Sequence, residues 1–236
     1  MSDSNANHVS TNDGGHDPLI AEDLMLVLFL PKTGTFASES MLYSLLGGAI
    51  LSDLILGNHV TVNDRGLKGT EIATTPNMPA DELLRESWEY LSKKPRDVQT
   101  LLAAMGPKLR APVIERLIER GELVRQEKKF LGLFPTKVLR GNATGRREYL
   151  RGLIRATLVD GEEPDTRTAT ITAFISASGA LPHFHPEIPW NSKTIARAKE
   201  FEQGNWGSKA VAAAVVSATT AVIVSTLVTT TMITRS

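Results

Sequence analysis

The chain has 236 residues, of which 42% are apolar, with no cysteine and with 26 basic against 26 acidic side chains. This length and apolar fraction suffice for one large domain with a buried core. The lack of cysteine excludes a disulfide scaffold, a zinc ribbon, an iron–sulfur cluster and thiol catalysis. The balanced charge argues against a general polyanion binder.

The charge is unevenly distributed along the chain. Residues 1–106 contain 7 basic and 14 acidic side chains, whereas residues 107–155 contain 13 basic and 5 acidic ones, a net charge of +8 for that block. A block of this sign attracts lipid headgroups, phosphates or acidic protein segments. The alternative is a solvated face that only keeps the protein soluble.

The first 17 residues are rich in Ser, Asn, Asp and Gly, which predicts a disordered tail. This segment has neither the basic start nor the apolar stretch of a secretory signal, so we expect a cytoplasmic protein. Residues 18–236 then form the folded domain.

Apolar residues predict the first elements in chain order. The run at residues 18–30 begins as a helix, and residues 38–56 carry apolar side chains at helical spacing, which indicates a buried helix. Strand-favouring residues on both sides of the turn at residues 63–66 predict a hairpin.

The middle of the chain predicts further helices and a second hairpin. Amphipathic helices are expected at residues 80–92, 97–105 and 111–120, then strands at 123–124 and 130–138, then helices at 145–158, 166–178 and 192–203. The expected fold is mostly α, a single-domain helical bundle with surrounding amphipathic helices and short β-hairpins.

The last segment, Ala210–Ile233, is uncharged over 24 residues. At about 1.5 Å per residue it could cross a hydrocarbon layer of about 30 Å. Its many Ala, Ser and Thr residues equally suit a helix buried in a bundle. A C-terminal membrane anchor and a core helix are both open at this point.

Three ordered segments give the chain a family resemblance: LIAEDLMLVLFLPKTG, GGAILSDLILGNHVTV and VIERLIERGELVRQEKKFLGLFPTKV. Together with the closing hydrophobic helix they span about residues 19–233. In this combination the chain resembles the Golgi phosphoprotein 3 family of peripheral membrane proteins, in a bacterial type.

The resemblance implies a helical bundle with the closing apolar helix buried at its centre, which favours the core helix over the anchor. Eukaryotic members bind phosphatidylinositol 4-phosphate on the cytosolic face of the Golgi and act as adaptors for the tails of membrane glycosyltransferases. We therefore expect a non-enzymatic, peripherally membrane-associated adaptor. Its partners would be an anionic phospholipid membrane and an unidentified protein client, and it could self-associate.

The family's lipid pocket is carried over in part. Its Trp and Arg near the second helix fall at Ser38 and Gly47, and its two basic residues three apart fall at Pro107 and Arg110. Lys108 is adjacent to the first of these. Since any cluster of Arg and Lys can meet phosphate charges, the expected lipid-binding residues are Lys108, Arg110, Lys128 and Lys129.

The segment EKKFLGLFPTKV resembles a family hairpin implicated in self-association and membrane contact. It places an apolar tip between Lys128 and Lys129 on one side and Lys137 on the other, a pattern that suits a membrane surface. The alternative is that the tip packs into the bundle. The predicted membrane or oligomer contacts are Phe130, Leu131, Leu133 and Phe134.

The sequence predicts no catalytic residue, cofactor or metal site. His183, His185 and Glu187 could hold a metal from a strand, but the prolines around them predict a loop. Glu22 and Asp23 are expected to be solvated or paired. Residues 111–139 could also form a DNA-binding winged helix, although the apolar residues of 111–120 predict a packing helix and make nucleic acid an unlikely partner.

Overall fold

The computed structural model describes residues 17–66, 69–130, 134–206 and 210–233. Within these ranges, side chains are described except at residues 128–130, 134–136, 210–212 and 225–233. The expected disordered tail, residues 1–17, lies outside the described residues except for Asp17.

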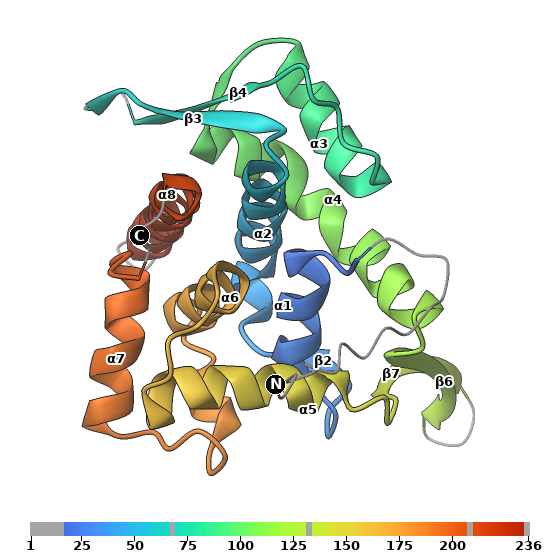
Figure 1. The fold of residues 1–236 in the computed structure, drawn as a ribbon. Coiled ribbons are helices and arrows are strands. Elements are labelled where there is room, and N and C mark those ends of the chain that lie inside the picture. The colour runs from blue at the N-terminus through green and yellow to red at the C-terminus, as the bar shows by residue number, and fades with distance from the viewer. Residues whose placement is uncertain (1–16, 67–68, 131–133, 207–209, 234–236) are drawn as a thin grey trace, which may run out of the picture.

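The helix α2 (Leu42–Leu56) has the central position of the bundle and follows a 3₁₀ turn, η1 (Glu39–Met41). It packs against α1 (Ile20–Leu28), α4 (Val98–Glu119), α6 (Thr166–Ala177) and α8 (Ala210–Ile233), which Figure 1 shows around it. Two glycines of α2 permit this close approach. A Cβ on Gly47 would lie 2.8 Å from Leu102 Cδ2 of α4, and one on Gly48 would lie 2.7 Å from Val222 Cγ1 of α8.

Shorter amphipathic helices lie on the outside: α3 (Glu82–Ser92), α5 (Arg146–Arg155), continued by a π-helical turn η3 (Ala156–Asp160), and α7 (Ser192–Glu202). A 3₁₀ turn, η4 (Leu181–Phe184), lies between α6 and α7. Side-chain caps explain several starts, because Asp81, Asp97, Asp165 and Asn191 each accept a hydrogen bond from a backbone N–H of the following helix.

The strands form three small antiparallel sheets. They are β1 (Phe29–Leu30) with β2 (Thr35–Phe36), then β3 (Val60–Asp64), β4 (Thr70–Thr74) and β5 (Arg96–Asp97), then β6 (Leu123–Phe130) with β7 (Phe134–Gly141). The prediction of a mostly α fold with short hairpins is confirmed.

The prediction of two helices at residues 97–105 and 111–120 is wrong, because α4 continues through Pro107 and Pro112. A proline removes the N–H that would bond the carbonyl four residues earlier. Those carbonyls belong to Ala103 and Lys108, which are both exposed, so solvent can satisfy them. The helix therefore tolerates both prolines.

The second hairpin also differs from its prediction. The first strand is long and ends at Phe130, so Phe130 belongs to β6 and not to the returning strand. The register runs from the pair Leu123 and Gly141 to the pair Phe130 and Phe134.

The resemblance implied that the closing helix lies at the centre of the bundle. In the structure α2 has that position, and the last helix, α8, lies beside it. In the described part of α8 one side is buried against the bundle, whereas Ala213 and Val224 are exposed. The buried residues are Val215, Ala218, Thr219, Val222 and Ile223.

Among the residues that the structure describes, one helical stretch, Glu39–Leu56, is long and apolar enough to cross a membrane, and 67% of it is buried inside the fold. This stretch is η1 with α2. Its burial is that of a core helix, a class that passes the same length and hydropathy test.

Candidate functional site

A basic surface forms where the turn between β1 and β2 meets β7. Gly34 in this turn has a φ of +75°, and a Cβ there would lie 2.6 Å from the carbonyl oxygen of Leu139. Arg140 Nη1 donates a hydrogen bond of 3.3 Å to the carbonyl of Pro31. A glycine is needed for this approach, which brings Lys32 next to the hairpin.

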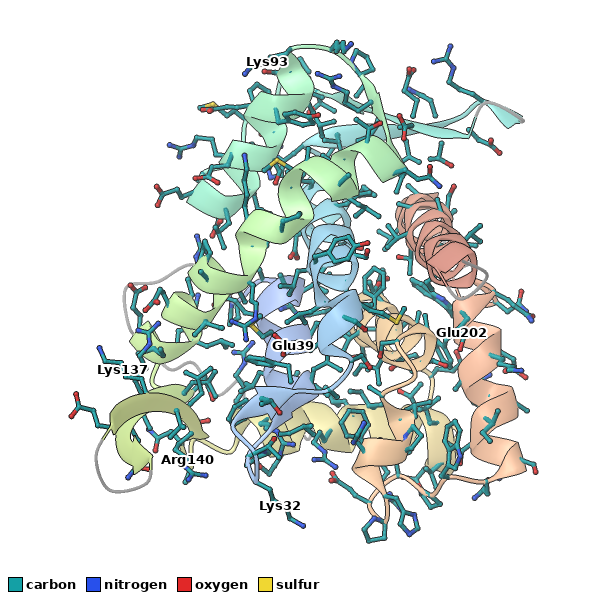
Figure 2. All side chains as sticks on the ribbon, turned by 180° about the vertical axis from the view of Figure 1, so that it is seen from behind. Lys32, Glu39, Lys93, Lys137, Arg140 and Glu202 are labelled. Atoms are coloured by element: carbon teal, nitrogen blue, oxygen red, sulfur yellow. The ribbon has the colours of Figure 1, made fainter. Side chains whose placement is uncertain are left out.

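We call Lys32, Lys137 and Arg140 the basic hairpin surface; Figure 2 labels all three. Lys32 and Lys137 are exposed and Arg140 is half-buried. None of the three has a carboxylate partner among the described side chains. Their charge is therefore available to an anionic partner.

The hairpin that carries Lys137 and Arg140 projects from the bundle. Leu123 is buried, but the next four residues, 124–127, are all exposed. Over residues 123–141 the sequence has five basic side chains and one acidic one. An exposed ribbon with this charge suits contact with a polyanionic surface.

The predicted lipid-binding residues fall in two places. Lys108 is exposed on α4. Arg110 is already engaged: its Nε donates to Glu39 Oε1 at 2.7 Å, and its guanidinium lies 5.5 Å from the centre of the Phe36 ring. The backbones of Lys128 and Lys129 lie in β6, in the same hairpin as Lys137 and Arg140, while their side chains lie outside the description.

The predicted contact residues fall at the end of the same hairpin. Phe130, the last residue of β6, pairs with Phe134, the first residue of β7, and the side chains of both are not described. Leu131 and Leu133 lie outside the described residues. Whether the apolar tip packs or is presented therefore stays a prediction.

The positions expected from the resemblance to form the family pocket make other contacts in this chain. Ser38 Oγ donates to the carbonyl of Ser178 at 2.7 Å. Gly47 lies at the crossing of α2 and α4, where a Cβ on Gly106 would lie 2.4 Å from the carbonyl oxygen of Tyr43. Arg110 is paired with Glu39, and Gly47 lies in a close helix crossing, so these positions contribute to the packing of this chain.

A buried ionic network centres on α1. Glu22 Oε1 accepts a hydrogen bond from Arg120 Nε at 2.7 Å, and Asp23 accepts from Arg146 Nε at 3.0 Å and from Arg167 Nε at 2.8 Å. Both carboxylates are buried. The prediction that Glu22 and Asp23 are solvated or paired is confirmed in its second form.

Asp53 of α2 adjoins this network. Its Oδ2 accepts a hydrogen bond of 2.7 Å from the N–H of Ile20, and its Oδ1 lies 3.9 Å from Arg167 Nη1. Burial raises the pKa of Asp53 to about 7, against the lowering effects of Arg167 and of the Ile20 N–H, and the charges of Asp23 and Glu22 raise it further. This carboxyl therefore titrates near neutral pH inside the bundle.

The remaining chemical hypotheses gain no geometric support. His183 and His185 are exposed around the turn η4, and Glu187 is paired with Arg151 at 2.6 Å. No group of three potential metal ligands occurs within the described part of the chain. Val113, Ile114 and Leu117 of α4 are buried, as the prediction of a packing helix requires.

Sequence reasoning missed Lys32 and Arg140 as site residues. Lys32 lies in the PKTG turn of the first family segment, and Arg140 lies just beyond the hairpin segment that was singled out. The turn and the hairpin meet across 109 positions of sequence. The sequence contains one signal for this surface, a lysine in a glycine-containing turn.

A comparison with protein families gives a match. The model for Golgi phosphoprotein 3 (GPP34) matches residues 20–218, from the start of α1 to a point within α8. A comparison with curated proteins gave no match. Because the matched span covers most of the chain, from the buried network through the basic hairpin to the last helix, the protein belongs to the Golgi phosphoprotein 3 (GPP34) family.

Proposed function

We propose that this protein associates peripherally with anionic membranes through the basic hairpin surface and acts there as an adaptor for a protein client. The observation that carries the proposal is a set of three cations without a carboxylate partner among the described side chains: Lys137 and Arg140 on the projecting hairpin, and Lys32 in the adjoining turn between β1 and β2. Each cation close to an acidic leaflet contributes about 1 kcal/mol. The three together contribute about 3 kcal/mol, and Lys128 and Lys129 of the same hairpin would add to this.

The lipid is recognised mainly by its charge. Arg110, at a position of the family pocket, is bound to Glu39 and lies against Phe36, so a headgroup at that place would have to displace an ion pair. Phosphatidylinositol 4-phosphate then binds as one anionic lipid among others. We expect preference to follow the charge density of the bilayer, since exposed cations on a ribbon act as a group.

The test is co-sedimentation of the full-length protein with vesicles of phosphatidylcholine alone, with added phosphatidylserine, or with added phosphatidylinositol 4-phosphate. Binding is expected to the two anionic compositions and to decrease as salt rises. The triple variant Lys32→Gln, Lys137→Gln, Arg140→Gln should lose most of this binding. Lys128→Gln with Lys129→Gln tests the neighbouring predicted cations.

The matched control removes the same charge elsewhere. Lys93, directly after α3, and Lys193 and Lys199 on α7 are exposed, and their triple Gln variant should bind anionic vesicles as the parent does. Equal losses of vesicle binding in both triple variants would show that binding depends only on the net charge of the protein. That result would overturn the assignment of membrane binding to the basic hairpin surface. Stronger binding to duplex DNA than to any vesicle would favour the nucleic-acid alternative.

A further inference from the structure

A second cationic site lies at the opposite end of α4. A cleft of about 400 Å³ opens between the turn after β3, the start of β4 and the segment that joins α3 to α4. Its lining includes Arg65, Glu71, Lys94, Arg96, Asp97 and Thr100. Three positive and two negative side chains therefore share one cavity.

Both acidic residues of the cleft are engaged. Glu71 Oε2 accepts a hydrogen bond of 2.5 Å from Arg65 Nη1. Asp97 accepts from the N–H of Thr100 at 2.8 Å and from its hydroxyl at 2.6 Å, and the hydroxyl bond is the main reason why the pKa of Asp97 is lowered. Each carboxylate thus has its own donor.

Two of the cations are not matched in this way. Lys94 is exposed, and no carboxylate of the described side chains pairs with it or with Arg96. The guanidinium of Arg96 lies 4.9 Å from the centre of the Tyr90 ring, and its buried Nε has no hydrogen-bond acceptor among the described atoms. The pairing of Arg96 with Ile72 in the sheet fixes its backbone at the cleft.

We propose that this cleft binds the phosphate group of a soluble phosphorylated ligand. A phosphate carries up to two negative charges and accepts several hydrogen bonds, which a guanidinium can donate as a pair. Lys94 adds a compact charge, and Arg65 extends the positive edge of the cavity. The volume exceeds that of a phosphate alone and lies within the usual range of small-molecule sites.

The position of the cleft favours a soluble source over a bilayer headgroup. At about 1.5 Å per residue, the 22 residues of α4 span roughly 33 Å. Figure 1 shows α4 running from the sheet of β3 and β4 to the hairpin of β6 and β7. When the basic hairpin surface lies on a membrane, the cleft is at the far end of α4. The inference uses other residues than the proposed function and goes beyond it.

The experiment is calorimetric titration of the full-length protein with pyrophosphate and with inorganic phosphate at constant ionic strength. Saturable binding is expected, and Lys94→Gln and Arg96→Gln should each weaken it by about tenfold or more, because each removes a charged hydrogen-bond donor. Lys93 is the matched control: it is exposed and adjacent to Lys94 but does not line the cleft. Lys93→Gln should leave the affinity unchanged.

Three results would overturn the proposal: no saturable binding, an equal loss in the Lys93→Gln variant, or full affinity in the Lys94→Gln variant. If Arg96→Gln fails to fold, Lys94→Gln still decides. A competition experiment with vesicles distinguishes a soluble phosphorylated ligand from a lipid headgroup. Excess pyrophosphate at constant ionic strength should leave vesicle binding intact, and competition would assign the cleft to a lipid headgroup. Pyrophosphate binding without any vesicle binding would refute the proposed function alone.

Discussion

At the residue scale, Asp53 links the stability of the bundle to pH. Its pKa of about 7 in the folded protein exceeds the ordinary value of 3.8, so between these values the folded state holds more protons than the unfolded state. Stability from this group is fully present below about pH 4 and is lost as the pH rises through 7. Asp53 thus opposes folding most strongly above neutrality, where it is ionised.

We expect Asp53→Asn to remove this dependence. The Asn oxygen can still accept the hydrogen bond from Ile20, but the side chain never becomes charged. One pKa unit corresponds to about 1.4 kcal/mol, so above pH 8 the variant should be more stable than the parent, by an amount on the order of 4 kcal/mol. Urea unfolding between pH 5 and 9 measures this difference.

The control is Asp160→Asn, which removes an exposed carboxylate paired with Arg155. Exposed pairs contribute little, so this variant should follow the parent at every pH. Parallel stability curves for the parent and Asp53→Asn would contradict the assignment of the titration to Asp53.

At the element scale, the sequence predicted most helices because their buried sides repeat at helical spacing. The prediction failed at α4, where the prolines indicated that the helix would be interrupted. The helix continues because the carbonyls that lose their hydrogen-bond donors belong to exposed residues. The predicted first strand of the second hairpin is also shorter than β6, because residues 124–127 are all exposed. A ribbon that projects into solvent lacks the alternation that marks a half-buried strand. The turn at Pro31 and Arg140 of β7 meet through a tertiary contact, which no local sequence pattern reports.

The role of α8 can be tested by deleting residues 207–236. The deletion uncovers the side of α2 at Gly48 and the Phe174 ring that packs there, and it removes the buried face of α8. Each large apolar side chain buried there contributes about 1.5–3 kcal/mol. We expect the truncated protein to lose its cooperative melt or to melt far below the full chain, as followed by circular dichroism.

Two valines of α8 provide a matched pair for that deletion. Val222 is 1% exposed and Val224 is 54% exposed. Val222→Ser should lower stability by a few kcal/mol, whereas Val224→Ser should change it little. A truncated protein that melts at the full-length temperature, with equal small effects of both valine variants, would identify α8 as an anchor and not as part of the core.

At the scale of the whole molecule, we propose that the end with the hairpin of β6 and β7 faces a membrane or a second copy. Phe130 and Phe134 pair at its end, beyond a stem of exposed residues. We expect Phe130→Ser with Phe134→Ser to weaken vesicle binding or self-association while leaving the melting temperature nearly unchanged. Co-sedimentation and analytical ultracentrifugation measure the two effects.

The paired control for the hairpin is Tyr149→Ser, a change at an aromatic residue that is 65% exposed on α5. It should leave vesicle binding and self-association as they are. A large loss of stability in the double Phe variant, with binding intact per folded molecule, would show that both rings belong to the core.

The network around Asp23 has a consequence for synthesis on the ribosome. Its arginine partners follow 123 and 144 residues later in the chain, and at about 5–20 residues per second the later one emerges roughly 7–30 seconds after Asp23. Until then α1 cannot be buried with its charge matched, so α1 and α2 emerge as apolar segments without their final neighbours. We expect folding to be completed after translation and the nascent chain to depend on chaperones, which ribosome-bound fragments ending before and after Arg167 would reveal by their sensitivity to protease.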